Sequence, residues 1–339
     1  MRRYGKHTDE DDVRVRPGRR GTRPRTHIRP KHEDAAEGMV LTVDRGRVTC
    51  LVDGRVVMAM KARELGRKAA VVGDRVALVG DLSGDKDTLA RMVRIAGRTS
   101  VLRRTADDDD PYERVVVANA DQLAIVTALA DPEPRPRLVD RCLVAAYDGG
   151  LEPLLVLTKS DLAPPDELLR TYEPLGVPYV VTSRGELTDG DALARVRELL
   201  DGRITAFVGH SGVGKTTLVN ALVPEARRRT TGRVNAVTGR GRHTTTSALA
   251  LPLDDDTADG GWVVDTPGVR SFGLAHVDPS RVIHAFPDLE PGTAGCPRAC
   301  GHDEPDCALD GWVAEGHADP ARLYSLRRLL ATRERHEGD

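Results

Sequence analysis

The stretch Gly209-His210-Ser211-Gly212-Val213-Gly214-Lys215-Thr216 decides how this chain folds. It matches the phosphate-binding pattern G-x-x-x-x-G-K-[ST], in which glycines let backbone amides turn toward phosphate oxygens. The apolar run 203–208 predicts a buried strand, and 215–222 predicts a helix whose N-terminus faces the anion. We expect Lys215 to meet the β and γ phosphates and the Thr216 hydroxyl to reach magnesium. An ordinary glycine turn is the alternative, and the flanking strand and helix argue against it.

A second motif, of the kind that reads guanine, comes before this loop in the chain. Thr158-Lys159-Ser160-Asp161 follows the apolar run 154–157 and so lies at the carboxyl end of a predicted strand, where open α/β sheets bind ligands. The Asp161 carboxylate can accept hydrogen bonds from N1–H and the exocyclic amine of guanine, which adenine cannot donate. Asparagine is usual at the first position, so with only the Thr158 hydroxyl we expect part of the hydrogen bonding that fixes this loop to be lost. A surface strand end is the alternative, and Ser183, after a neighbouring predicted strand, is the expected contact in the adjacent base loop.

Two further segments follow the phosphate loop. Trp262-Val263-Val264-Asp265-Thr266-Pro267-Gly268 reads as a strand that ends in D-x-x-G, whose aspartate reaches magnesium through water and whose glycine amide senses the γ-phosphate. Thr244-Thr245-Thr246 is the candidate for the other switch, with Thr245 favoured as the magnesium ligand and Thr246 next. A threonine triplet alone is more often a solvated strand edge, and its position between the phosphate loop and D-x-x-G favours the switch.

The motif order is therefore base reader, phosphate loop, threonine switch and D-x-x-G, whereas an ordinary GTPase has its base reader last. This order predicts a circular permutation. The chain then leaves the nucleotide domain directly after the second switch, so the state of the γ-phosphate can be passed to a C-terminal domain.

The C-terminal part carries four metal-ligating side chains within twelve residues, namely Cys296, Cys300, His302 and Cys307. Three thiolates and one imidazole make a tetrahedral zinc set, and clustering in a loop rich in Gly and Pro suits a structural site. Disulfides or unrelated cysteines are the alternatives. The other two cysteines are isolated and no signal peptide is found, so we favour a metal site in a cytoplasmic protein.

The permuted order, Gly241-Arg242-His243-Thr244-Thr245-Thr246, D-x-x-G and the Cys-Cys-His-Cys knuckle resemble the RsgA (YjeQ) family of GTPases that depend on the small ribosomal subunit. The resemblance covers roughly residues 38–335. It implies an OB-fold barrel, one structural zinc ion per chain, and His243 as the residue that orients the attacking water. The family spaces the first two cysteines, and the histidine and last cysteine, one residue wider.

Charge and composition indicate several domains in a soluble protein. The 339 residues suggest two or three domains, and no apolar run approaches the roughly 20 residues needed to cross a bilayer. The net charge of -2 hides an asymmetry, because residues 1–32 hold eleven Lys/Arg against four Asp/Glu. Such an arm cannot bury enough apolar surface to fold alone, so we expect it to be disordered and to contact RNA phosphates or act as a solubilising tail.

Short runs between residues 38 and 97 alternate apolar and polar positions and predict strands over 39–43, 47–52, 56–60 and 74–79. Strands separated by Gly turns suggest a small closed barrel. No Phe, Tyr or Trp occurs between Gly5 and Pro111, so any RNA contact of the barrel must run through Arg and Lys and not through base stacking.

An ordinary GTPase orients the attacking water with a glutamine directly after D-x-x-G, and this chain has Val269 there. The residue that orients the water must therefore come from another part of the chain. His243, beside the threonine switch, is the best candidate, and a surface histidine is the alternative. With a mobile switch, hydrolysis is expected to be slow until a ribosomal partner orders it.

The expected fold is multidomain α/β: a basic arm (1–37), an OB-fold barrel (38–97), a linker (98–112), a circularly permuted P-loop GTPase domain with a doubly wound sheet (113–277) and a zinc-binding helical domain (278–339). The expected function is GTP hydrolysis on the small ribosomal subunit during its late maturation, with rRNA contacted through barrel, arm and zinc domain and with release on hydrolysis. A monomer is expected. An RNA-binding scaffold with incidental hydrolysis and a P-loop ATPase are the alternatives, and Asp161 opposes the second.

The expected catalytic residues are His243, Lys215 and Thr245, and the expected nucleotide-binding residues are Thr158, Lys159, Ser160, Asp161, Ser183, Gly209, His210, Ser211, Gly212, Val213, Gly214, Lys215, Thr216, Thr217, Asp265 and Gly268.

Overall fold

The computed structural model describes residues 32–44, 46–66, 69–104, 114–186, 190–227, 248–254, 260–267, 274, 277 and 279–332. The basic arm up to residue 31, the threonine switch and Gly268 lie outside these ranges. None of the helices in the described part of the chain is both long and apolar enough to cross a bilayer.

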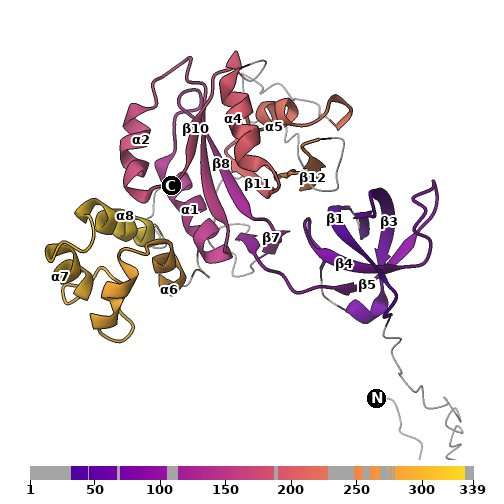
Figure 1. Cartoon of the computed structure of the whole chain (residues 1–339), viewed down its shortest axis with the longest axis horizontal. Helices are drawn as coiled ribbons and strands as arrows, with labels where there is room; N and C mark the ends of the chain where they lie inside the picture. Colours follow the sequence, from indigo (N-terminus) through magenta and orange to yellow (C-terminus); the bar gives the residue numbers. More distant parts are fainter. Residues whose placement is uncertain are drawn as a thin grey trace, which may run out of the picture. The chain divides into compact units, whose positions relative to one another are not determined.

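Five strands form the barrel (Figure 1): β1 Ala36–Asp44, β2 Arg47–Val52, β3 Arg55–Lys61, β4 Arg75–Val79 and β5 Ala90–Ile95. The order β1-β2-β3-β5-β4 closes because β4 also pairs with β1. Alternate side chains point inward, and the interior contains Val40, Cys50, Val57, Leu78 and Met92 without exposed surface. The four predicted strands are present, and β5 is a fifth that the pattern analysis missed.

The segment after the barrel forms a two-stranded antiparallel ribbon of β6 Val101–Arg104 and β7 Arg114–Ala118. The linker expected over 98–112 thus includes a strand. The backbone of β6 packs closely on α1 of the nucleotide domain. A Cβ atom at Gly149, the last residue of α1, would lie 2.3 Å from the Val101 carbonyl oxygen, so only glycine allows this approach.

The nucleotide domain is built on a sheet with the order β10-β9-β8-β11-β13-β12. The first five strands are parallel and β12 is antiparallel to β13. The predicted doubly wound sheet is therefore confirmed, with an antiparallel edge strand added. The strands are β8 Gln122–Ala128, β9 Glu152–Thr158, β10 Tyr179–Val181, β11 Ile204–Gly209, β12 Leu249–Pro252 and β13 Trp262–Asp265.

Helices cover both faces of this sheet, as Figure 1 shows. Leu123 and Ile125 of β8 belong to the core beneath α1, whereas Ala124 and Val126 belong to the core beneath α4 and α5. This alternation follows from the two-residue period of a strand. The helices are α1 Pro136–Gly149, α2 Asp166–Tyr172, α4 Asp191–Leu200 and α5 Lys215–Leu222.

The C-terminal region is helical and contains α6 Pro279–Val282, α7 Ala308–Ala314 and α8 Pro320–Ala331. The helix predicted from Asp319-Pro320 is α8. Its Asp319 side chain accepts a 2.7 Å hydrogen bond from the Ala321 amide, which caps the helix. The predicted apolar stripe is buried: Leu323, Leu326, Leu329 and Leu330.

An arginine of α8 reaches the nucleotide domain. Arg328 donates a 3.1 Å hydrogen bond to the Thr171 carbonyl, and its Nη2 atom lies 3.2 Å from Asp140 Oδ1 of α1 as an ion pair without hydrogen-bond geometry. The guanidinium also lies over the Tyr172 ring, 5.1 Å from its centroid. Burial raises the pKa of Asp140 to about 6, and the charge of Arg328 limits this rise.

Candidate nucleotide site and metal centre

The phosphate loop joins the end of β11 to the start of α5, as predicted. Gly209 ends the strand where a Cβ would lie 2.5 Å from the Val126 carbonyl oxygen, so no larger residue fits. Gly212 and Gly214 have φ values of +88° and +93°, which L-residues with side chains rarely adopt. The geometry of the loop thus requires glycine at these three positions. The loop then leads directly into the N-terminus of α5.

Lys215 is the first residue of α5, and its ammonium group is buried against D-x-x-G. Its Nζ atom donates to Asp265 Oδ1 and, over 2.6 Å, to the Thr266 carbonyl oxygen. Asp265 reaches this position because β13 pairs with β11 in parallel register, with Phe207 opposite Asp265. The Thr266 hydroxyl donates to the Phe207 carbonyl at 2.7 Å and fixes the strand end. Two motifs that lie 50 residues apart in the chain therefore meet at one ion pair.

The base loop is tied directly to the phosphate loop. The Thr158 hydroxyl lies 2.6 Å from the Val213 carbonyl oxygen and 3.3 Å from that of Thr127, and Thr158 is buried. Lys159 has a φ of +62° and its ammonium donates to the Asp131 carbonyl. The hydroxyl that was expected to be a weak substitute for asparagine thus keeps a link between the two loops.

Asp161 and Ser183 lie on adjacent loops at the carboxyl ends of β9 and β10. The Ser160 amide donates to the Thr182 carbonyl at 3.2 Å, and Asp161 Oδ1 accepts from the Arg184 amide at 3.4 Å. Asp161 is exposed, so its carboxylate is accessible to a ligand. The parallel register of Val181 with Leu157 brings these loops together.

Glu186 was not singled out by sequence reasoning. Its Oε2 atom accepts a 2.8 Å hydrogen bond from the Ser183 amide, and the Ser183 hydroxyl accepts a 3.3 Å bond from the Glu186 amide. The only sequence signal is an S/T-x-x-E spacing at a strand end.

The other expected nucleotide residues divide into two groups. His210, Ser211 and Thr216 lie in the described phosphate loop or at the start of α5, with Thr216 half-buried and Thr217 exposed. His243, Thr245, Thr246, Gly268 and Val269 lie outside the described residues.

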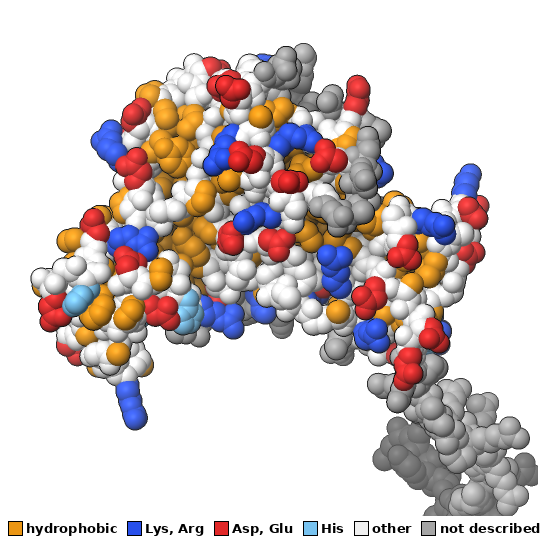
Figure 2. Space-filling view, in the orientation of Figure 1, with side chains coloured by type: hydrophobic (Ala, Val, Ile, Leu, Met, Phe, Trp, Pro, Cys, Tyr) orange, Lys and Arg blue, Asp and Glu red, His pale blue; other side chains and the backbone are white. Residues whose placement is uncertain are grey.

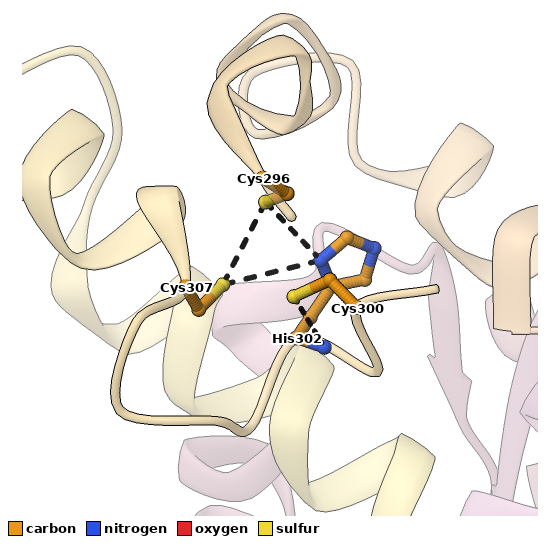
Figure 3. A group of neighbouring side chains, drawn as sticks. All are labelled: Cys296, Cys300, His302 and Cys307. Atoms are coloured by element: carbon orange, nitrogen blue, oxygen red, sulfur yellow. Dashed lines mark hydrogen bonds between the residues drawn. The ribbon is translucent and has the colours of Figure 1, made fainter. Parts of the chain in front are cut away.

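The four predicted metal ligands come together (Figure 3). Their ligand atoms lie within 4.8 Å of one another. Cys296 Sγ is 3.9 Å from Cys307 Sγ and 3.8 Å from His302 Nδ1, and the distance between Cys307 Sγ and His302 Nδ1 is 4.0 Å. Bonds of about 2.3 Å around a tetrahedral ion give ligand separations of about 3.8 Å. Cys296, His302 and Cys307 therefore have the separations of ligands around a tetrahedral ion, and the Cys300 thiol lies within 4.8 Å of them, so the four side chains could hold a metal ion.

Side chains around the cluster hold the ligand loop. Arg327 Nε donates to the His302 carbonyl at 2.7 Å, and Glu304 Oε1 accepts from the Gly301 amide at 2.7 Å. Burial lowers the pKa of His302, which favours the neutral imidazole that binds metal. Hydrogen bonds from backbone amides, with that of Gly301 first, lower the pKa of Glu304 to about 2. Arg327 and Glu304 carry no local pattern that would have marked them in the sequence.

The strand order, the buried Lys215–Asp265 pair and the base loop before the phosphate loop define a circularly permuted P-loop GTPase. The family model described as RsgA GTPase matches residues 95–275. A relative from Pseudomonas putida F1, named small ribosomal subunit biogenesis GTPase RsgA, is 39% identical over 272 residues, which cover 78% of this chain and 75% of the relative. The chain belongs to the RsgA GTPase family.

Solved structures agree with this assignment. The crystal structure of YjeQ from Thermotoga maritima is 27% identical and covers 88% of this chain and 98% of its own, with a TM-score of 0.59. YloQ, described as a circularly permuted GTPase, shares the fold with a TM-score of 0.61 at 20% identity, over 90% of this chain and 99% of its own. The predicted family and fold class are confirmed.

Proposed function

We propose that this GTPase hydrolyses GTP on the small ribosomal subunit during its late maturation and leaves the subunit after hydrolysis. The observation that supports the chemistry is the contact between Lys215 and Asp265. The lysine that binds the phosphates and the carboxylate that reaches magnesium must lie close together for GTP hydrolysis. The partner is suggested by relatives named for small ribosomal subunit biogenesis.

Each described residue of the nucleotide site has a role in this proposal. Amides of the phosphate loop and the Lys215 ammonium bind the phosphates, so Lys215 must exchange its contact with Asp265 for phosphate oxygens. Asp161 reads guanine N1–H and the exocyclic amine, and Ser183 contacts the base from the adjacent loop. Thr158 and Lys159 hold the base loop in place.

Magnesium suits the oxygen donors that the start of α5 and the end of β13 supply. The Thr216 hydroxyl would bind the ion directly and Asp265 through water, since hard cations prefer carboxylate and hydroxyl oxygens. Thr245 would supply the switch hydroxyl. The ion neutralises charge on the phosphates during transfer.

For the catalytic water we propose His243, from the segment beside the threonine switch. The argument is chemical, because Val269 has no group that can orient water and an imidazole has one. Gly268 would sense the γ-phosphate through its amide.

The metal centre is proposed to bind one zinc ion per chain in a structural role. Cys296, Cys300, His302 and Cys307 supply four ligands of the kind that zinc prefers, and four protein ligands leave no open position for catalysis. The ion would hold together a module whose described helices are short.

Charge distribution supports RNA contact by the N-terminal half. The arm over residues 1–32 has a net charge of +7, and the barrel over 38–97 has eleven Lys/Arg against seven Asp/Glu. The zinc module over 278–339 has seven Lys/Arg against twelve Asp/Glu, so phosphate binding is least favoured there. Figure 2 shows basic and acidic side chains intermixed on the face in view.

We place the protein in the cytoplasm as a monomer, and we keep the domain limits of the sequence analysis except that the linker contributes β6 to the ribbon with β7. The cytoplasmic location follows from a ribosomal partner, and the monomer follows from a nucleotide site that one chain supplies. GTP turnover measured with purified small subunits, large subunits and neither tests the function. Selective stimulation by small subunits supports it, and equal turnover in all three favours the RNA-binding scaffold.

A further inference from the structure

Arg322 of α8 joins the C-terminal region to the nucleotide domain and uses each of its three guanidinium nitrogens. The Nε and Nη2 atoms donate to the two carboxylate oxygens of Asp288 at 3.0 and 2.8 Å. The Nη1 atom donates to the Pro174 carbonyl oxygen at 3.0 Å. The guanidinium also lies over the Phe286 ring, 4.8 Å from its centroid. Asp288 thus fixes the planar fork of the arginine, and the third nitrogen is directed at the nucleotide domain.

Pro174 lies in the segment that connects the two proposed base loops. Asp161 belongs to the first loop and Ser183 to the second. Between them the chain forms α2, the 3-10 turn η3 Glu173–Leu175 and β10. The bond from Arg322 therefore holds this connection near its middle, away from both loops.

Other contacts of α8 hold the same segment. Arg328 donates to the Thr171 carbonyl oxygen at the end of α2, so two arginines of one helix bond carbonyl groups of this connection. Apolar side chains of α2, η3 and α8 also belong to one buried core: Leu168, Tyr172, Leu175, Leu323, Leu326, Leu329 and Leu330. The position of α2 consequently depends on the docking of α8.

The loop that bears Asp161 is fixed at one end by β9 and at the other by α2, which begins at Asp166. Backbone bonds within and beside this loop are those from the Leu162 amide to the Lys159 carbonyl, at 2.9 Å, and from the Ser160 amide to the Thr182 carbonyl, at 3.2 Å. A displacement of α2 therefore shifts Asp161, whereas the phosphate loop is carried by other elements, β11 and α5.

We propose that Arg322 is a positioning residue for guanine recognition, which sets the place of the Asp161 loop by holding η3. This inference rests on the proposed guanine site. The permuted chain enters the C-terminal region directly after D-x-x-G, at the phosphate end of the nucleotide site. The bond from Arg322 joins the same region to the base end. Docking of α8 consequently strengthens guanine binding, and release of α8 weakens it.

The test measures dissociation constants of GTP and of inorganic tripolyphosphate for the full chain, as wild type, Arg322→Ala, Arg322→Lys and Tyr324→Ala. We expect Arg322→Ala to bind GTP about fivefold more weakly, within the range of coupling through packed contacts. Arg322→Lys should lose a similar part, because an ammonium group does not reproduce the planar fork. Tripolyphosphate affinity should not change, since this probe needs the phosphate loop alone. Tyr324→Ala removes a largely exposed side chain of α8 and should leave both constants unchanged.

A double-mutant cycle with Asp161→Ala distinguishes positioning from a general loss of stability. If Arg322 acts through Asp161, Arg322→Ala should not lower GTP affinity further once Asp161 is alanine. Amide hydrogen exchange at Ser160 and Leu162 should be faster in Arg322→Ala, whereas Leu218 of α5 should exchange as in wild type. These readouts would not change in this pattern if Arg322 only stabilised the C-terminal region.

Unaltered GTP affinity in Arg322→Ala overturns the proposal, also when α8 is released from the nucleotide domain. An equal loss of GTP affinity with and without Asp161, or an equal loss of tripolyphosphate affinity, overturns it as well. Failure of the guanine site itself would appear separately, as an Asp161→Ala single variant that binds GTP like wild type.

Discussion

The Thr158 hydroxyl lies 2.6 Å from the Val213 carbonyl oxygen, so the end of β9 is joined to the phosphate loop by one buried hydrogen bond. The two residues lie 55 positions apart. In the proposed site, Asp161 and the phosphate loop bind opposite ends of one nucleotide, and this bond would fix their separation before the ligand arrives.

Thr158→Val should weaken GTP binding about fivefold, because it removes a hydrogen bond of about 1 kcal/mol without changing the side-chain volume. Thr158→Asn should restore affinity, since an amide can donate to the same carbonyl. Thr205→Val is the control, because its buried hydroxyl bonds to Gln122 and not to the phosphate loop. Equal affinities for wild type and Thr158→Val, measured by titration calorimetry, would show that the loops are fixed by other contacts.

Asp161→Asn should weaken GTP binding by about 1–3 kcal/mol and favour xanthosine triphosphate. The reason is that an amide cannot accept from both N1–H and the exocyclic amine of guanine, but its own NH2 can donate to the O2 of xanthine. Competition between the two nucleotides measures the change. Unchanged preference for GTP would remove Asp161 from the base site.

The sequence was sufficient where the chemistry is local. The phosphate loop, the loop at Asp161 and the four clustered metal-ligand candidates each occupy a short run, so their residue types and spacing predicted where they lie on strands and helices. Strand β5 was missed because only two of its six residues, Ala90 and Met92, are buried and two others, Arg91 and Arg94, are charged and exposed, so its apolar pattern is weak. The pairs Ser183–Glu186 and Asp140–Arg328 could not be predicted either. The first resembles many surface turns, and the second joins helices that are far apart in the chain.

Metal analysis should find about one zinc ion per chain, and Cys300→Ser should lose it. The variant should unfold its C-terminal region at lower denaturant than the nucleotide domain, because ligand binding and folding of such a module are coupled. Cys50→Ala, which removes a barrel thiol, is the control and should retain the metal. Full zinc content in Cys300→Ser, or none in wild type, would exclude the proposed centre.

His243→Ala should leave GTP affinity nearly unchanged, because the imidazole is proposed to contact water and not the base or phosphates. Turnover stimulated by small subunits should fall by about 10² or more, the range for losing a positioned catalytic group. The GTP-bound variant should also remain longer on the subunit. His284→Ala, which removes an exposed histidine paired with Glu290, is the control. Stimulated turnover within a factor of about two of wild type would show that another residue, or the ribosome, positions the water.

Arg328→Ala should destabilise the docking of α8 by about 2–3 kcal/mol near pH 8, because it leaves the Asp140 carboxylate buried without its partner. The loss should depend on pH. The pKa of Asp140 is raised from 3.8 to about 6, so the folded protein binds its proton more tightly than the unfolded chain does. This contribution is complete below pH 3.8 and is lost as the pH rises toward 6. Without Arg328 the pKa rises further, so the loss should continue above pH 6.

Urea unfolding at pH 5, 6, 7 and 8 measures this difference. Adding Asp140→Asn to Arg328→Ala should remove the extra pH dependence, since no titrating group remains at that place. Arg195→Ala breaks an exposed ion pair with Glu198 and should change stability by less than about 0.5 kcal/mol at every pH. Parallel stability curves for wild type and Arg328→Ala across this range would mean that Asp140 titrates independently of Arg328.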